Sequence, residues 1–550
     1  MKPRVTARAV FLACALTFVC ADGFADNLRR ILPYDSLVAA QLRSIYLEQG
    51  KVPLSSAGPY SLDEISVMLE RIDPDTLSKA GRRAYEEIAA AVREAEKDGD
   101  SGKGNPISVA WHPSVALEGY LHVNQVPAET RWEYGYNERA PLVSVPIEVN
   151  VGRGFFGTFD LDLKERHDTL NASLVPSNPT NWYEDAAYVD LQFPFRAFVA
   201  AGGPNWSLSL GRDRFTWGVG ETGNLIVSDS PDYHDFARLT GYWRRFKYSG
   251  LWLGLASQYD TYNAPPQNTT DNYTNNPRNF LLHRIDVAVL DRLSVGIMEG
   301  ILVGGVPLEL VYFNPVMIFH NLFRWHDASS ILALEAAFNP WRYMELYGEF
   351  VLNEFATAFE QTRYPEDRIP NAFGCLGGVR ARIPLGAGYL DGGGEFVYVN
   401  PWMYLRENDL TSYGWYRYQW SDVPGSTQWV SACLGYGEGP DSMVAAGWVG
   451  YEAPGAYSVG VDFRMSWKGE QTLDTDWTKG ADAAALVAPS GTPERRMVLH
   501  ARASVTPLAW LTVGCHLYGI STWNLGHAAG APRSDDLQAV LSVRASLPSR

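Results

Sequence analysis

Residues 457–467 read YSVGVDFRMSW and alternate strictly between apolar side chains and small or polar ones. The apolar positions are Tyr457, Val459, Val461, Phe463, Met465 and Trp467. The intervening positions are Ser458, Gly460, Asp462, Arg464 and Ser466. Because successive side chains of a β-strand point to opposite faces, this stretch predicts a long strand with one apolar face and one polar face.

Three further segments, 537–547, 497–505 and 158–164, repeat this design. Their polar faces carry charges of both signs, such as Asp160 and Arg544. Strands of up to about ten residues are longer than the five or six that are usual in soluble sheets. One face against lipid and one against water are typical of a transmembrane β-barrel. The mainly β fold class that we predict is therefore a closed antiparallel barrel.

Neither a spanning helix nor a soluble β-fold fits the apolar segments as well as a barrel does. A spanning helix needs roughly 18 consecutive apolar residues, and the most apolar late segment, 287–313, is interrupted by charges. These charges are Asp291, Arg292, Glu299 and Glu309. A soluble β-sandwich or propeller also alternates, but a propeller would show a repeat of roughly 40 to 50 residues, and we find none. Since only helices and closed barrels satisfy every backbone polar group in lipid, the barrel is favoured.

The first residues predict an export signal. Lys2, Arg4 and Arg8 form a basic start, residues 10–20 are an apolar run, and Gly23-Phe24-Ala25 is a small-x-Ala cleavage site. This order is typical of a secretory signal peptide, which we assign to residues 1–25. An exported barrel without a spanning helix is expected in the outer membrane of a diderm bacterium, after cleavage of the signal.

Residues 26–105 predict a small helical region on the periplasmic side, ending in a linker. Helical spacing occurs in 34–49, 61–72 and 78–97. Ser61 and Glu64 fit a capping box, in which each side chain bonds the backbone of the other residue. Residues 97–105 are polar and glycine-rich, which is typical of a linker. The barrel would then occupy residues 106–550, enough for about 16 to 20 strands at roughly 25 residues per strand and turn.

Composition excludes some functions. The formal net charge is -16, which argues against nucleic acid as a partner, because phosphate binding needs a basic surface. After signal cleavage three cysteines remain, Cys375, Cys433 and Cys515, too few and too far apart for a disulfide framework or a zinc site. We find no metalloprotease, nucleophile-elbow, P-loop or EF-hand motif. The sequence therefore predicts no enzyme activity, no cofactor and no metal.

The segment 211–230, GRDRFTWGVGETGNLIVSDS, is the densest in chemically useful side chains. If residues 208–217 form one strand, Arg212 and Arg214 share a face and Trp217 lies opposite. In a functional interpretation the arginines bind carboxylates or phosphates of an acidic glycan and Trp217 stacks on a sugar ring. In a structural interpretation inward arginines pair with acidic neighbours in the lumen, and Trp217 joins an aromatic belt at the rim.

This segment is also where the sequence resembles the capsule assembly Wzi family. The resemblance is carried by Gly211, Arg212, Trp217, Gly218, Gly220 and 225–229, by Asn314-Pro315, 327–330 and 346–350, and by 59–65 before the barrel. It covers most of residues 30–355. It implies an outer-membrane barrel of about 18 strands with a helical periplasmic region. It also implies lectin-like attachment of surface polysaccharide, and it adds Ser228 and Asp229 to the candidate glycan-binding residues.

From these observations we predict a non-catalytic barrel that binds or anchors surface polysaccharide. Its surroundings would be outer-membrane lipid, and the barrel assembly machinery would be its partner during biogenesis. The alternative is a porin-like diffusion channel, which the charged inner face supports; an acidic lumen would favour cations. A hydrolase or acyl-modifying enzyme would need convergent polar side chains, and sequence alone does not reveal convergence.

Overall fold

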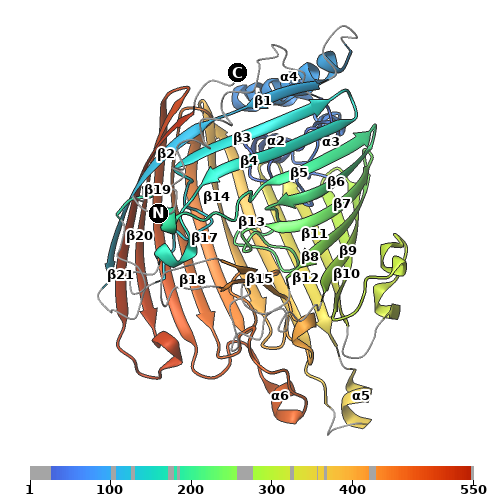
Figure 1. Ribbon diagram of the computed structural model, residues 1–550, viewed down its shortest axis with the longest axis vertical. Helices are drawn as coiled ribbons and strands as arrows, with labels where there is room; N and C mark the ends of the chain where they lie inside the picture. The colour runs from blue at the N-terminus through green and yellow to red at the C-terminus, as the bar shows by residue number, and fades with distance from the viewer. Residues whose placement is uncertain are drawn as a thin grey trace, which may run out of the picture.

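The computed structural model describes residues 27–100, 107–124, 131–170, 179–182, 186–256, 277–322, 328–355, 357–363, 368–419 and 429–546. The predicted signal peptide and the predicted linker positions 101–105 lie outside the described residues. The described chain is a closed antiparallel β-barrel with helices at one end (Figure 1). The predicted fold class is confirmed.

Strands of the barrel follow one another around the wall in chain order. They are β1 Ile107–Trp111, β2 Ser114–Asn124, β3 Val143–Val151, β4 Phe155–Leu163, β5 Ala197–Gly203, β6 Trp206–Asp213, β7 His234–Tyr242, β8 Phe246–Leu255, β9 Arg278–Leu290, β10 Leu293–Gly304, β11 Ala328–Trp341, β12 Met344–Glu354, β13 Ala372–Leu385, β14 Gly388–Val399, β17 Ser442–Ala453, β18 Tyr457–Lys468, β19 Glu494–Leu508, β20 Leu511–Trp523 and β21 Ser534–Ser546. A separate hairpin is formed by β15 Gly414–Tyr418 and β16 Trp429–Cys433.

The wall closes where β2 pairs with β21 along its whole length. The short β1 pairs with β3, and so do the first two residues of β2, so β1 and β2 together occupy a single place in the wall. The closed barrel therefore has 18 strands, the number that the Wzi resemblance implies. Pairing runs around the whole circle, with register shifts in a few pairs and with β1 paired on one side only. The closed circle is the arrangement that a lipid environment requires.

The described outer face of the wall is mainly apolar. On β18, Val459, Val461 and Phe463 are exposed, and the equivalent positions of β21 are Leu537, Leu541 and Val543. Exposed aromatic side chains ring the turns at the helical end of the barrel. They are Phe155, Trp206, Trp243, Trp341 and Trp510. An apolar band edged by aromatic residues is the pattern of a barrel surrounded by lipid.

Connections differ between the two ends of the barrel. At the helical end the turns are short; two residues separate β9 from β10 and two separate β11 from β12. At the other end the connections are long, and they carry α5 Ala358–Arg363, α6 Ala481–Ala485 and the β15–β16 hairpin (Figure 1). Short periplasmic turns and long outer loops are usual in bacterial barrels. This arrangement agrees with the prediction that the helical region lies on the periplasmic side, which stays a prediction.

The helical region contains α2 Leu37–Glu48, α3 Leu62–Leu69 and α4 Lys79–Asp100, so its three predicted helices are confirmed. One half of the predicted capping box is present, because the Ser61 hydroxyl accepts from the Glu64 N–H at 3.2 Å. The other half is wrong, since the Glu64 carboxylate instead binds Lys247 on the barrel wall. The linker prediction is also wrong at residues 97–100, because α4 continues to Asp100. No helix in the described ranges is long and apolar enough to cross a membrane.

A plug fills the centre of the lumen. It consists of residues 52–61, which enter from the helical end, and the β6–β7 connection, residues 214–233. Buried apolar side chains of the plug, such as Val52 and Leu225, pack against inward residues of the wall such as Phe198 and Met298. The main core of this molecule therefore lies inside the barrel.

Candidate functional site

Trp217 joins the two parts of the plug. Its side chain is fully buried, and its indole N–H donates to the Gly58 carbonyl at 2.7 Å. Its backbone N–H donates to the Val227 carbonyl at 2.9 Å, and the same residue forms a β-bridge with Ala57. The tight turn that follows needs glycine, because a Cβ at Gly218 would lie 2.0 Å from the Asn224 side chain.

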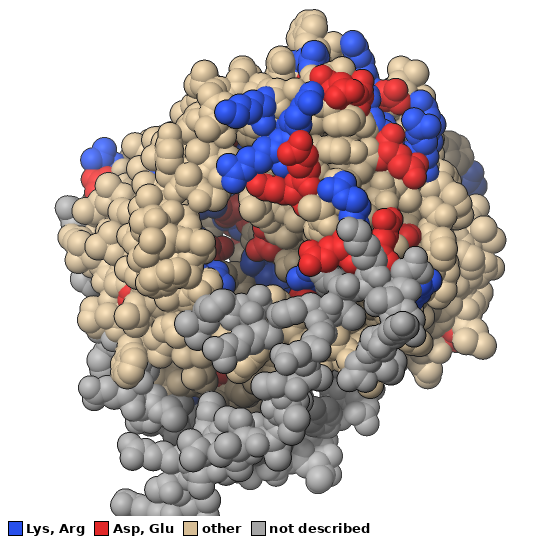
Figure 2. Space-filling view, turned by 90° about the horizontal axis from the view of Figure 1, so that it is seen from above, with Lys and Arg blue, Asp and Glu red and all other residues tan. Residues whose placement is uncertain are grey.

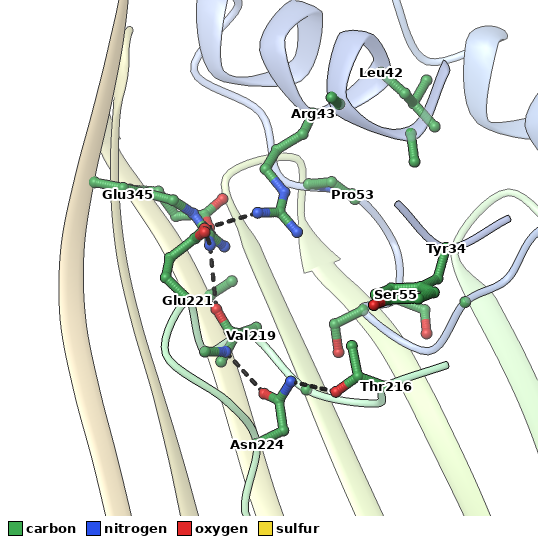
Figure 3. Close-up of a pocket in the computed structure, with 18 of the residues that line it drawn as sticks. Tyr34, Leu42, Arg43, Pro53, Ser55, Thr216, Val219, Glu221, Asn224 and Glu345 are labelled. Carbon is green, nitrogen blue, oxygen red and sulfur yellow. Dashed lines mark hydrogen bonds and ion pairs between the residues drawn. The ribbon is translucent and has the colours of Figure 1, made fainter. Parts of the chain in front are cut away.

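Charged side chains tie this loop to the wall and to α2. Arg380 on β13 binds both Glu345 on β12 and Glu221 in the loop. Arg43 on α2 binds Glu221 at 2.7 Å, so Glu221 lies between two guanidinium groups (Figure 3). Burial alone would raise the pKa of Glu221, but Arg43 and Arg380 outweigh burial and hold that pKa below its usual value.

A second set of buried charges holds the N-terminal part of the plug. Lys247 on β8 binds the Glu64 carboxylate at 2.6 Å and the Ala57 carbonyl at 2.7 Å. On β9, Arg284 binds Asp286 at 2.6 Å and also Glu335 of β11. Burial raises the pKa of Glu64, although Lys247 opposes this shift. Breaking any of these pairs would leave a charge without its partner in the lumen.

A cavity of about 450 Å³ lies between α2, the loop 214–233 and the wall strands β12–β14 and β17 (Figure 3). Seen from the helical end, the barrel is hollowed beside the helices, and acidic and basic side chains lie within the hollow (Figure 2). The charged residues that line the cavity are Asp35, Arg43, Glu221, Asp229, Glu335, Glu345, Arg380, Arg382 and Asp391. Such a lining can hydrogen-bond a ligand rich in hydroxyl groups. Groups of three or more metal-ligating side chains are absent from the described residues.

The structure separates Arg212 from Arg214, so the prediction that they share a face is wrong. The strand β6 ends at Asp213 rather than continuing to residue 217, because the chain leaves the wall there to enter the lumen. Arg212 lies on the outward face of β6, where its Nε and Nη2 donate to Asp235 at 2.7 and 2.9 Å. Its guanidinium also lies 3.7 Å from the centre of the Tyr233 ring.

Arg214 and Asp229 lie together inside the barrel. The Nε of Arg214 donates to the Asp229 carbonyl at 2.7 Å, and Asp229 accepts from the Tyr34 hydroxyl at 3.0 Å. Both side chains are partly exposed, and Asp229 lines the cavity. Trp217 and Ser228, in contrast, are fully buried and contact the plug or the 400–441 loop. A sugar cannot stack on Trp217 in this arrangement, nor does Trp217 belong to the rim belt.

Several residues that build this site were not found from sequence. They are Tyr34, Lys247, Arg284, Glu345 and Arg380. Four of them lie on barrel strands, and the only available signal was a charged residue on the polar face of an alternating segment. That signal predicts an inward position but not a partner, because each partner is distant in sequence.

A further polar cluster lies in the loops on the side away from the helices. The Asp232 carboxylate contacts His167 Nε2 at 3.0 Å and Arg417 Nε at 2.5 Å. Arg417 also binds Asp190 at 2.7 Å, and the His167 ring stacks on Tyr136 at 3.8 Å. Burial would raise the pKa of Asp232, but His167 and Arg417 outweigh it and lower that pKa to about 2. These contacts connect the β15–β16 hairpin with the β4–β5 and β6–β7 connections.

Comparison with known proteins supports the fold but does not identify a family or a function. No protein-family model matches the chain, and no curated protein matches it by sequence. Among solved structures it is similar to Wzi of Escherichia coli, an outer membrane protein involved in group 1 capsule assembly and a carbohydrate-binding β-barrel. The TM-score is 0.55 at 14% identity, over 94% of this chain and 98% of that one. The two chains share the barrel fold. Membership of the Wzi family stays a prediction.

Weaker similarity extends to Pseudomonas aeruginosa outer-membrane proteins. OprD matches with a TM-score of 0.37 at 11% identity, over 80% of this chain and 96% of that one. OccD3 matches with a TM-score of 0.39 at 10% identity, over 81% of this chain and 96% of that one. Scores this low do not distinguish between functions.

Proposed function

We propose that this protein is an outer-membrane β-barrel that binds or anchors a surface polysaccharide without catalysing a reaction. The observation that carries the proposal is the plug, which occupies the lumen of a barrel with an apolar exterior and is tied in place by buried charges. A lumen organised in this way supports a holding role better than free passage. The whole-chain similarity to Wzi, a carbohydrate-binding barrel, agrees with it.

The candidate contacts for an acidic glycan are Arg214 and Asp229 inside the barrel and, separately, Arg212 on the outward face of β6; all three keep exposed surface. A guanidinium presents a planar fork of donors that matches a sugar carboxylate. The Asp229 carboxylate can accept hydrogen bonds from sugar hydroxyl groups. Trp217 and Ser228 would act differently, by holding the loop that carries Arg214 and Asp229 in its place.

Binding of an acidic capsular polysaccharide to the purified protein in detergent tests the proposal. Arg212→Ala, Arg214→Ala and Asp229→Ala should each weaken binding, as measured by retention on the immobilised glycan. Arg533→Ala is the matched control, because Arg533 lies in the β20–β21 connection and pairs only with its neighbour Asp535 in the contacts described. Binding that is unchanged in all three variants would remove these residues from the site.

Planar-bilayer recording tests the alternative of a porin-like channel. A plugged barrel should give no steady conductance, whereas a diffusion channel gives stable open pores. Steady conductance of the wild-type protein, together with no glycan binding, would replace the proposal by the channel function.

A further inference from the structure

One connection folds back over the outside of the barrel instead of over its mouth. Residues 305–322, which we call the flap, follow β10 and lie outside the wall beside β9 and β10 (yellow-green at the right of Figure 1). The flap contains two short 3-10 turns, Leu310–Phe313 and Phe319–Leu322. It packs through Tyr312 and Phe319 onto a cluster of wall residues. These wall residues are Leu281, Ile301, Val303 and Ala328.

Beneath the flap lies an ionisable pair on the outer face of the wall. His283 on β9 is directly opposite Glu299 on β10, which is opposite Leu332 on β11. Leu332 is 43% exposed on the outer face, whereas its neighbour Ile331 belongs to the luminal core. His283 and Glu299 therefore point outward, and their side chains meet at 3.2 Å.

The flap covers this pair and contacts both of its members. The backbone N–H of His320 donates to the second oxygen of Glu299 at 2.9 Å. The Phe319 ring stacks on the His283 ring, with centroids 4.6 Å apart and planes at 15°. A charged side chain on the lipid face of a barrel is destabilising, and its cost depends on its depth in the bilayer. A covering segment that excludes lipid and donates a hydrogen bond lowers that penalty.

The opposite side of the flap is strongly apolar and uncovered in the described chain. Leu310 is 88% exposed and Val316 is 83% exposed, and Phe313 and Ile318 are also exposed. The flap contains a single acidic residue, Glu309, and neither lysine nor arginine. A loop in water rarely exposes so many large apolar side chains together. Around it the outer wall continues with further exposed apolar residues, Ile285, Ile297, Leu332 and Leu334.

We propose that the flap is a lipid-contacting element, which presents Leu310, Phe313, Val316 and Ile318 to the acyl chains of the membrane while it shields the His283–Glu299 pair from them. The inference rests on the proposed location in a membrane but not on glycan binding. The exposed face of the flap continues the apolar outer wall. It should therefore contact the same lipid as the wall does. A second copy of the chain is the competing occupant.

Fluorescence quenching tests the flap with one labelled cysteine at a time. Cys375 and Cys515 are first replaced by alanine, which leaves the buried Cys433. An environment-sensitive dye is then attached at Val316→Cys in the flap, at Leu541→Cys on the apolar belt, and at Thr478→Cys in the exposed β18–β19 connection. Each protein is reconstituted into phosphatidylethanolamine–phosphatidylglycerol vesicles, with or without brominated acyl chains.

We expect the dye at residue 316 to lose as much emission to brominated lipid as the dye at 541, and to resist aqueous iodide, which quenches the dye at 478. Quenching at 316 that follows residue 478 would overturn the flap inference, while quenching at 541 would still support the membrane location. No lipid quenching at 541 would instead reject that location. Efficient bis-maleimide cross-linking of Val316→Cys into dimers at low protein-to-lipid ratio would assign the surface to a second copy and overturn the inference.

Discussion

Replacing Trp217 tests whether the plug is held as the contacts indicate. The indole fills a fully buried site, and its N–H is the donor to the Gly58 carbonyl at 2.7 Å. Trp217→Ala removes both the packing and the hydrogen bond. Trp217→Phe keeps most of the packing and removes only the hydrogen bond, so the pair of variants separates the two contributions.

The expected magnitudes follow from these two losses. Truncating a buried aromatic side chain to alanine costs roughly 3–5 kcal/mol. Leaving one buried carbonyl without its donor costs roughly 1–3 kcal/mol, which is what Trp217→Phe should show. At about 1.4 kcal/mol per factor of ten, Trp217→Ala should raise the open fraction of the plug by at least a hundredfold.

Native-state hydrogen exchange measures this opening directly. Amide protection in residues 52–58 and 225–228 reports the free energy of plug opening. Trp402→Ala is the matched control, because Trp402 is also a buried indole that donates at 2.8 Å, but to Ala483 in the outer loops. It should deprotect the β18–β19 connection and leave the plug unchanged. Trp217→Ala should also produce intermittent conductance in planar bilayers.

The reasoning is refuted if plug amides keep wild-type protection in Trp217→Ala while the barrel stays folded. Equal losses in Trp217→Ala and Trp402→Ala would also contradict it, because they would indicate general loosening rather than release of one contact.

Three further outcomes are expected. Glu64→Leu and Lys247→Met should each lower the stability of the plug by roughly 3–5 kcal/mol in hydrogen exchange, whereas the double variant should recover most of the loss, because it removes both charges of this pair. The low pKa of Asp232, about 2, stabilises the outer-loop cluster above the usual aspartate pKa, so roughly 2–3 kcal/mol should be lost as pH falls from about 5 to about 1. Proteolysis of the β15–β16 hairpin should report this loss, and Asp232→Asn should remove this contribution to its pH dependence. Burial raises the pKa of Cys433 to about 12, so mass spectrometry should find it unalkylated at pH 8 until the protein unfolds.

The barrel strands were predictable because their pattern is local. Residues 457–467, 497–505, 537–547 and 158–164 all lie within or overlap observed strands, namely β18, β19, β21 and β4. A strand that separates lipid from a polar lumen must alternate, whatever its neighbours are. The helices within residues 26–105 could also be predicted, since their apolar side chains repeat with the period of a helix.

The candidate segment was located by sequence but its geometry was not. Extending alternation to residue 217 placed Arg212 and Arg214 on one face, whereas the wall ends at Asp213 and the chain turns into the lumen. No local signal marks that departure, because plug packing decides it. Trp217 is therefore a buried side chain that connects the two parts of the plug, and it offers no exposed surface on which a sugar could stack.

By itself the amino-acid sequence determined the class of fold, the approximate number of strands and the presence of a helical region before the barrel. These depend on periodicity within short stretches, and such periodicity survives whatever the distant chain does. Only the tertiary structure decided what fills the lumen, which charges meet and where the flap lies. Arg43 and Glu221 are 178 residues apart, and Glu64 and Lys247 are 183 apart. Such pairs form only once the wall has closed and brought both partners together.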